Sequence, residues 1–194
     1  MANAQKQETI SKLKKVYSTI SQATKRAIID NGPADEWIED PKFGSDQDYY
    51  FNTYIKPYYN AEDCFGPTPK CGYTENSVWT KLDGSTEEVL WYGPLAHAFM
   101  LSDGTYIKFW MDGGPTTCEN PYIGYCYPQY IVDINGPKGP NKFGRDVFVF
   151  DIESPEGLIG NQYDEEDCKR GTTGYGCSTK LMKDNWEFKD DYPW

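Results

Sequence analysis

The first 30 residues constrain the fold more than any other part of the sequence, because they are expected to form one long amphipathic helix. Between Gln5 and Ile29 the apolar side chains recur at steps of three and four, the spacing of one face of an α-helix. Asn31-Gly32-Pro33 predicts its end, since Gly adopts the left-handed conformation that follows a helix and Pro cannot continue one. At about 1.5 Å per residue the helix would be about 40 Å long, comparable with the diameter of the domain. The side chains expected to place it on a sheet are Ile10, Leu13, Val16, Ile20, Ala23 and Ala27.

The 194-residue chain is expected to form one domain, with residues 1–31 as the helix and residues 32–194 as a globular α/β head. Residues 1–31 contain six Lys or Arg and two Asp or Glu, net +4, whereas residues 32–194 contain 13 and 28, net -15. A solvated helix face explains this difference, and so does a helix that contacts the acidic heads of neighbouring copies. The net charge of -11 for the whole chain argues against nucleic acid as a partner.

Short strands separated by turn residues are expected after the helix, with a short second helix within residues 46–60. The clearest feature is a hairpin in which Ser102-Asp103-Gly104 joins two apolar runs. The run Asp146–Ile152 has apolar side chains at alternate and intervening positions, so both of its faces are expected to be covered, one of them by the long helix. The predicted strands are 78–82, 97–101, 105–110, 130–134 and 146–152.

Six cysteines fall into three close couples, with six, seven and eight residues between the partners. Sequence alone leaves 15 pairings open, and the local spacing favours pairing within each couple, which would stabilise each loop by roughly 2–3 kcal/mol. Reduced thiols and zinc ligation are the alternatives, and zinc would prefer CxxC knuckles with histidine partners. Disulfides imply an oxidising location outside the cytoplasm. The expected pairs are Cys64–Cys71, Cys118–Cys126 and Cys168–Cys177.

These patterns predict an α+β fold in which the long N-terminal helix packs on an antiparallel sheet of about three to five strands and disulfides staple the loops. The sequence offers no sign of catalysis. Its one histidine, His97, lies between two alanines in a predicted strand and is expected to be structural, and no nucleophile elbow, metalloprotease helix or nucleotide-binding loop is present. We therefore expect no catalytic residues and no enzymatic activity.

The most distinctive run is VDINGPKGPN at residues 132–141, followed by GRDVF at residues 144–148. It resembles the soluble domains of bacterial type IV pilin-like proteins and type II secretion pseudopilins. Three further segments agree with this resemblance, and together they extend it over roughly the whole chain in the order of the family. The family's leader, its processing site and its hydrophobic half-helix do not precede Met1, which we interpret as truncation. The three segments are 16–32, 51–59 and 177–194.

The resemblance implies a pilin-like fold and a structural subunit of a type IV pilus or a type II secretion pseudopilus. Such subunits are stored in the inner membrane by the segment absent here and polymerise through their N-terminal helices. The implied location is the cell envelope, periplasmic or extracellular. The implied partners are other copies or related pilin-like subunits and the inner-membrane assembly machinery. A helix that protrudes past its own head would leave apolar and basic surface for neighbouring subunits to cover.

The resemblance also implies a possible calcium site, because G-type pseudopilins bind calcium in a loop near the end of the sheet. The side chains that offer hard oxygens there are Asp133, Asn135, Asn141 and Asp146. Their Asp-x-Asn spacing resembles calcium loops, but no bidentate Glu follows where an EF-hand would place one. The alternative is that these side chains satisfy turn amides. The acidic run 164–167 is another possible contributor, and no other cofactor is expected.

Aromatic residues are abundant, with 16 Tyr and six Trp. Aromatic side chains on exposed loops stack on sugars or mark protein contacts, although in loop-rich domains they also form core. A secreted or surface carbohydrate-binding or adhesin module is therefore the alternative function. The loop aromatics that suggest it are Tyr122, Tyr125, Tyr127, Trp186 and Trp194.

Overall fold

The structure, a computed structural model, describes residues 2–37, 45–64, 70–89, 96–110, 129–153, 157–161 and 164–194. Its first element is helix α1 (Ala2–Asn31), after which Gly32 takes a φ of 84° and donates its amide hydrogen to Ile28 O at 2.9 Å. The helix stops here because glycine has no Cβ to oppose this left-handed conformation. Within the described part of the chain, no helix is both long and apolar enough to cross a membrane.

Six strands form one antiparallel sheet, and two more form a second, smaller sheet. The order across the large sheet is β1-β4-β5-β6-β7-β8. Its strands are β1 (Ala61–Asp63), β4 (Ala96–Leu101), β5 (Tyr106–Trp110), β6 (Gln129–Asp133), β7 (Val147–Glu153) and β8 (Gly157–Ile159). The small sheet pairs β2 (Val78–Thr80) with β3 (Thr86–Glu88). The remaining helical elements are η1 (Ala34–Glu36), α2 (Ser45–Tyr50), η2 (Phe51–Ile55), η3 (Lys56–Tyr58), η4 (Gly136–Lys138), η5 (Glu165–Asp167) and α3 (Cys177–Lys183).

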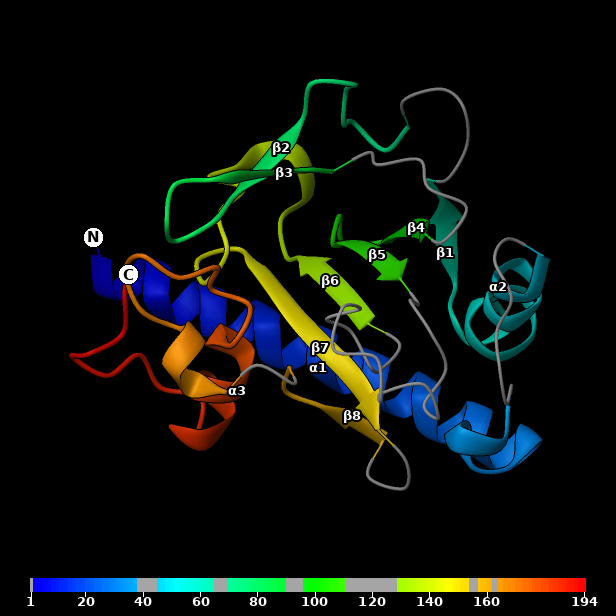
Figure 1. Ribbon diagram of the computed structural model, residues 1–194. Coiled ribbons are helices and arrows are strands. Elements are labelled where there is room, and N and C mark those ends of the chain that lie inside the picture. Colours follow the sequence, from blue (N-terminus) through cyan, green and yellow to red (C-terminus); the bar gives the residue numbers. More distant parts are fainter. Residues whose placement is uncertain are drawn as a thin grey trace.

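The large sheet lies between α1 on one face and the β2–β3 hairpin on the other (Figure 1). Strand β7 contributes to both layers. Phe148 and Phe150 are fully buried in the cluster that includes α1, whereas Val147 and Val149 belong to the cluster beneath the hairpin. Side chains alternate between the faces of a strand, so a strand that is apolar throughout requires cover on both sides.

The predicted pilin-like fold class is wrong. The prediction was a helix on a pilin-like sheet of about three to five strands, whereas the described residues form a six-stranded sheet and a separate two-stranded one, which makes the fold richer in strand than expected. Two of the additional strands, β1 and β8, are edge strands of three residues each, too short to show a reliable alternation. The strand predicted near residue 78 does not join the large sheet, because it pairs with β3 in the second layer.

The sheet-facing residues of α1 are all buried, with exposed fractions of 7% or less. The side of α1 that faces solvent is polar except for Ile29, which with Tyr49 makes up the exposed large hydrophobic side chains in the described part of the chain. The expected apolar surface on this helix is therefore not what the structure shows, because the molecule's own sheet covers that face. The buried residues are Ile10, Leu13, Val16, Ile20, Ala23 and Ala27.

Two disulfide bonds are present, Cys64–Cys71 and Cys168–Cys177. Both join the neighbours that local spacing favoured. The second connects the end of η5 to the start of α3, so it ties down a turn-rich segment. Disulfides of this kind are typical of secreted and extracellular proteins, which supports a location outside the cytoplasm. The third expected pair, Cys118–Cys126, lies outside the described residues.

Candidate functional site

Asp133, at the end of β6, is completely buried beneath the β2–β3 hairpin. Its Oδ2 accepts hydrogen bonds from Tyr73 Oη at 2.7 Å and from Trp79 Nε1 at 3.1 Å. Burial and the nearby charge of Asp146 raise the pKa of the Asp133 carboxyl to about 7, against the opposing effect of these donors. The carboxyl therefore connects the large sheet to the hairpin layer.

Asp146 and Asn141 organise the loop that joins β6 to β7. The Asp146 carboxylate accepts the backbone N–H of Asn141 at 2.8 Å and of Lys142 at 2.7 Å, and Asn141 Oδ1 accepts the amide of Gly139. The four expected calcium ligands do lie in this one region, and most of their oxygens satisfy turn amides or buried donors. The oxygen of Asn135 is the one without a hydrogen-bond partner among the described residues. Those residues contain no group of three or more His, Cys, Asp or Glu able to hold a metal, and calcium binding stays a prediction.

Two glycines of the distinctive motif lie so close to neighbouring atoms that a side chain would not fit. Gly136 has a φ of 59°, and a Cβ there would lie 2.8 Å from the backbone oxygen of Gly104 in the β4–β5 turn. Gly144 has a φ of 76°, and a Cβ there would lie 2.9 Å from Cys177 Sγ. Any side chain at either position would be strained and would collide, so packing requires glycine at both positions.

His97 is part of the aromatic packing on the α1 side of the sheet. Its ring stacks on Phe51 with centroids 4.1 Å apart, and Nε2 lies 3.0 Å from the Asp48 carboxylate. Burial lowers the pKa of His97, and the charge of Asp48 opposes this effect. The residue thus connects the α2–η2 segment to β4.

The acidic run around η5 divides between structure and surface. The Asp167 carboxylate accepts from Thr173 Oγ1 at 2.6 Å and from the amide of Tyr175 at 2.9 Å, so it shapes the loop before α3. Glu165 and Glu166 form surface ion pairs with lysines at 3.4 and 3.0 Å. Surface pairs of this kind contribute little to stability.

Of the loop aromatics expected to mark a ligand site, the two in the C-terminal segment pack against the protein itself. Trp186 lies 5.1 Å from the ring of Tyr17 on α1, and Trp194 lies 4.7 Å from Phe188. Both are partly buried against the core. The others, Tyr122, Tyr125 and Tyr127, lie outside the described residues.

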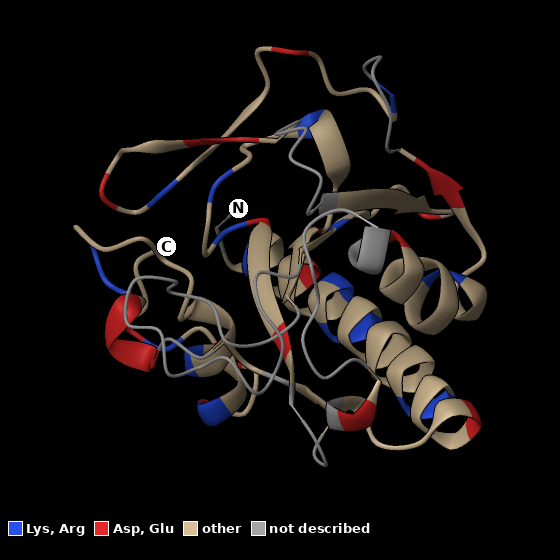
Figure 2. Ribbon diagram, turned by 45° about the vertical axis from the view of Figure 1, so that its right-hand side comes forward, with Lys and Arg blue, Asp and Glu red and all other residues tan. Residues whose placement is uncertain are grey.

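Helix α1 presents a continuous polar stripe on the side away from the sheet, and Figure 2 shows basic residues along its length. Among the described residues, Lys14 and Lys25 of this stripe have no ion-pair partner, whereas Lys12 and Lys15 are paired with carboxylates at 2.9 and 2.7 Å. Every member of the stripe is exposed, and they follow one another at steps of three and four. The outer α1 stripe consists of Gln7, Ser11, Lys14, Ser18, Gln22, Lys25 and Ile29.

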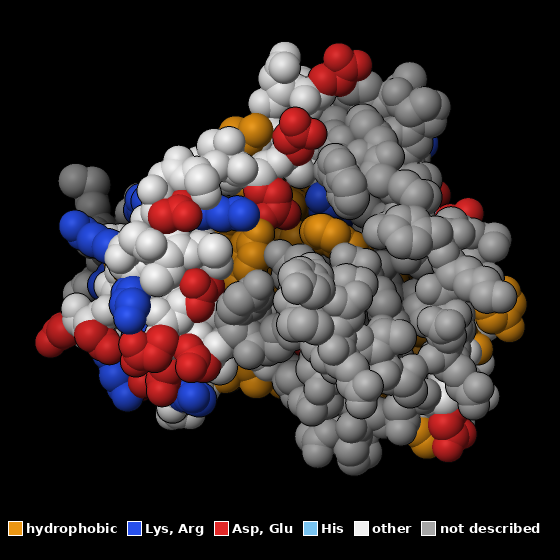
Figure 3. Space-filling view, in the orientation of Figure 1, with side chains coloured by type: hydrophobic (Ala, Val, Ile, Leu, Met, Phe, Trp, Pro, Cys, Tyr) orange, Lys and Arg blue, Asp and Glu red, His pale blue; other side chains and the backbone are white. Residues whose placement is uncertain are grey.

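On the opposite side of the molecule, a cavity of about 430 Å³ opens between the small sheet and β5. In Figure 3, acidic, basic and hydrophobic side chains meet over this part of the surface. We refer to it as the hairpin cavity. Its lining residues are Lys81, Thr86, Glu87, Glu88, Lys108, Trp110 and Tyr175.

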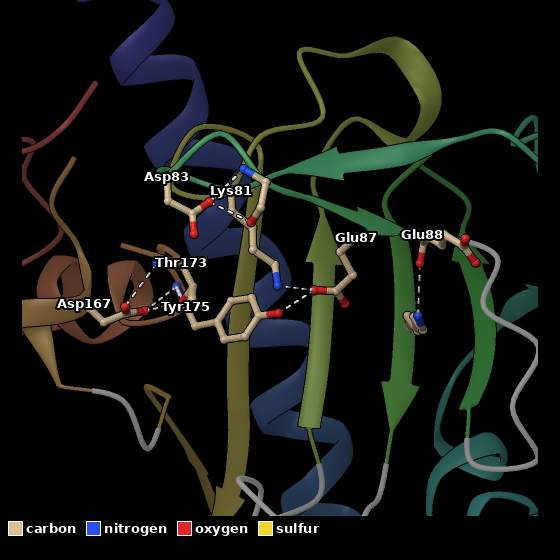
Figure 4. Close-up of polar contacts among 9 residues, drawn as sticks. Lys81, Asp83, Glu87, Glu88, Asp167, Thr173 and Tyr175 are labelled. Atoms are coloured by element: carbon tan, nitrogen blue, oxygen red, sulfur yellow. Dashed lines mark hydrogen bonds and ion pairs between the residues drawn. The ribbon is translucent and has the colours of Figure 1, made fainter. Parts of the chain in front are cut away.

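Three chain segments bring a polar network to one wall of the hairpin cavity (Figure 4). Glu87 on β3 accepts a short hydrogen bond from Tyr175 Oη, and Lys81 Nζ lies 3.5 Å from the same carboxylate. The ammonium of Lys81 also lies 5.0 Å from the centre of the Tyr175 ring. Tyr175 is held from behind by Asp167, so the network is fixed before any ligand arrives.

Lys108 lies at the floor of the hairpin cavity, on β5, and is only 2% exposed. Its Nζ is 3.5 Å from the backbone oxygen of Glu88 and within 5.9 Å of the ring centres of Trp79 and Trp110. Burial lowers the pKa of this ammonium group, and the carboxylates of Glu87 and Glu88 oppose that effect. A lysine is seldom buried to this degree without a specific role or partner.

Sequence reasoning did not find the hairpin cavity. One signal was available, because Lys108 interrupts the otherwise apolar run 106–110 at a position that alternation assigns to a buried face. The two glutamates of β3 carried no comparable signal, since acidic pairs are frequent in this chain. The partnership of Lys108 with them depends on the hairpin folding over the sheet.

The comparisons with known proteins identify a family. A model described as a family of unknown function (DUF6613) matches residues 1–194, and the chain belongs to that family. No curated protein and no solved structure matches the chain significantly.

Proposed function

We propose that the protein is a structural subunit of a cell-envelope polymer, of the kind to which type IV pili and type II secretion pseudopili belong, and that copies contact one another through α1. The outer α1 stripe is the observation that carries this proposal. One side of a 30-residue helix is buried on the sheet, and the other offers solvent-facing lysines without ion-pair partners among the described residues. The remainder of the chain, residues 32–194, has a net charge of -15.

Opposite charges on two parts of one molecule favour head-to-tail association, since the basic helix of one copy can lie on the acidic head of the next. A contact between two different surfaces does not close on itself, so it generates a filament when it repeats. Each exposed charge pair contributes only about 0.2–1 kcal/mol, and complementary charge acts mainly on register and partner choice. The long helix therefore supplies many weak contacts rather than one strong one.

Location and partners follow from the same proposal. The subunits are assembled at the inner membrane, and the machinery of that membrane adds them to the polymer. The sequence resemblance supports this step, and the disulfide bonds support folding outside the cytoplasm. The proposal depends on the helix surface and not on the number of strands in the sheet.

The test is site-specific cross-linking of the protein in the cells that produce it. A photoreactive amino acid replaces Ser18, an exposed member of the outer α1 stripe. Illumination should give a ladder of products that contain two or more copies, or one copy and a related subunit, identified by mass spectrometry. Charge reversal in Lys14→Glu with Lys25→Glu should reduce the ladder about tenfold or more.

The matched control carries the same number of charge reversals elsewhere. Lys138→Glu with Lys169→Glu changes two exposed lysines outside α1 and should leave the ladder intact. If position 18 yields no product with another subunit, or if both double variants behave alike, the helix is not the assembly surface.

A further inference from the structure

We propose that the hairpin cavity binds a neutral carbohydrate, with the sugar ring against Trp110 and its hydroxyl groups on the surrounding charged side chains. This activity is separate from assembly, because the cavity lies on the face of the sheet opposite α1. It would give a structural subunit, or a free-standing protein, the ability to attach to a glycan surface.

The size and shape of the cavity fit a small polar ligand. Its volume of about 430 Å³ lies within the range of ordinary small-molecule sites, about 300–1,000 Å³. Its walls come from the small sheet, from β5 and from the loop before α3, and these are fixed by hydrogen bonds within the protein. A fixed site loses little conformational entropy when a ligand binds.

The charges of the site favour a ligand without net charge. Two ammonium groups and two carboxylates line the cavity, so their formal charges cancel. With equal numbers of both signs, the cavity offers no net charge for an anion or a cation to neutralise. A fully apolar ligand is excluded, because it would remove these groups from water without replacing their hydrogen bonds.

A polyhydroxylated ligand meets both demands. A hydroxyl group donates and accepts hydrogen bonds, so neighbouring hydroxyls can satisfy a carboxylate acceptor and an ammonium donor at once. Hydrogen bonds to charged groups are stronger than those between neutral groups. Glu87 and the buried Lys108 offer one of each kind in the same cavity.

The aromatic residues supply the apolar contact that a sugar also requires. One face of a sugar ring carries mainly C–H groups, and these pack on aromatic surfaces in a site that is otherwise polar. Trp110 is partly exposed and offers the aromatic surface, whereas Tyr175 is 6% exposed, has Lys81 over its ring and contributes the polar surround beside Glu87. Tyr and Trp are favoured where one end of the side chain lies in an apolar environment and the other end contacts water.

The proposal is tested by screening the whole chain against a defined panel with saturation-transfer NMR, followed by calorimetric titration of the sugars that bind. The panel contains neutral hexoses, N-acetylhexosamines and their di- and trisaccharides. Glucuronate, sialic acid, glucosamine and free amino acids serve as charged comparators. At least one neutral sugar should bind, and more tightly than every charged comparator.

Two variants locate the binding. Trp110→Ala removes the aromatic wall and should weaken binding about tenfold or more. Thr86→Trp fills the cavity from an exposed position on β3 that should leave the fold intact, and it should abolish binding. The matched control, Asn76→Trp, adds the same side chain at an exposed position outside the cavity and should bind like the wild type.

The outcomes are decisive in either direction. Failure of the whole neutral panel, tighter binding of a charged comparator, or binding that survives Thr86→Trp each overturns the proposal. The cross-linking ladder from position 18 should be unchanged in Thr86→Trp. A loss of sugar binding with an intact ladder therefore separates this site from the assembly surface.

Discussion

The two faces of the large sheet carry different kinds of buried side chain. Toward α1, the sheet contributes a continuous apolar and aromatic layer in which Phe148 and Phe150 meet the buried face of the helix. Toward the hairpin, the same strands bury charged side chains among aromatic ones, including Lys108 and Asp133. One face therefore stabilises the fold by removing apolar surface from water, and the other retains groups that cost free energy to bury.

This difference indicates that one face mainly stabilises the fold and the other mainly positions polar groups. Removing a charged group from water costs free energy, so buried charges are expected where the structure or a bound ligand requires them. Apart from His97, the α1 face depends mainly on shape and apolar area, which many sequences can supply. The hairpin face needs particular donors and acceptors at particular places, and it contains the hairpin cavity. Three experiments examine the contrast, beginning with the largest expected effect.

Phe148→Ala should be the most destabilising of the three, because it leaves a cavity in the apolar layer beneath α1. Phe148 is completely buried, and substitutions of this type cost about 3–5 kcal/mol. The free energy of unfolding in urea measures the loss. Phe188→Ala, at a partly buried ring near the C-terminus, should cost clearly less, and a loss below about 1 kcal/mol for Phe148→Ala would contradict the account of this face.

Asp133 should make the stability of the hairpin face depend on pH. Its pKa is raised in the folded state to about 7 from about 4, so the folded protein binds the extra proton between these values. The resulting stabilisation is present at pH 4 and is lost as the pH rises through 7, with a difference of about 4 kcal/mol. Urea unfolding from pH 4 to pH 8, in the presence of a chelator, should show this slope in the wild type and not in Asp133→Asn.

Asp103 provides the control for that slope. Burial raises its pKa, but hydrogen bonds from Lys15 and Thr105 prevail, and the pKa is lowered overall. Asp103→Asn should therefore remove a stabilisation that is present at higher pH and lost as the pH falls, the opposite sign. Equal slopes in the wild type and in Asp133→Asn would show that Asp133 titrates normally.

Lys108→Met should have the smallest effect on stability although the residue is buried. Methionine can occupy the same space without a charge to desolvate, and exchanging buried charges for apolar groups is frequently neutral. At neutral pH the change in unfolding free energy should be within about 1 kcal/mol. A loss greater than about 2 kcal/mol would show that the ammonium group supports the fold itself. In that case the contrast between the two faces would be weaker than proposed.

Local patterns in the sequence were sufficient for a defined part of this structure. Helix α1 and its buried residues could be predicted from spacing, because a helix repeats its contacts every three to four residues. The β4–β5 hairpin followed from one Asp-Gly turn, and the disulfide pairs Cys64–Cys71 and Cys168–Cys177 from short separations. Each of these features depends on residues close together in the chain.

The number of strands and the role of the hairpin could not be predicted in this way. Strand β1 is exposed along its whole length and has no alternation to detect. The small sheet does not pair with the large one and instead packs over one of its faces. The expected calcium ligands show a related limit. Sequence placed their oxygens in one loop, but only the structure shows that Asp146 uses its carboxylate on two backbone amides.

The amino-acid sequence by itself determined the long helix, the face by which it packs, the turns and the local disulfides, since these arise from interactions within a few residues. The tertiary structure alone decided the second layer and the hairpin cavity. The hydrogen bond between Tyr175 and Glu87 joins residues 88 positions apart. No local periodicity encodes such a pair, because it forms only when the hairpin and the segment before α3 fold over the same face of the large sheet.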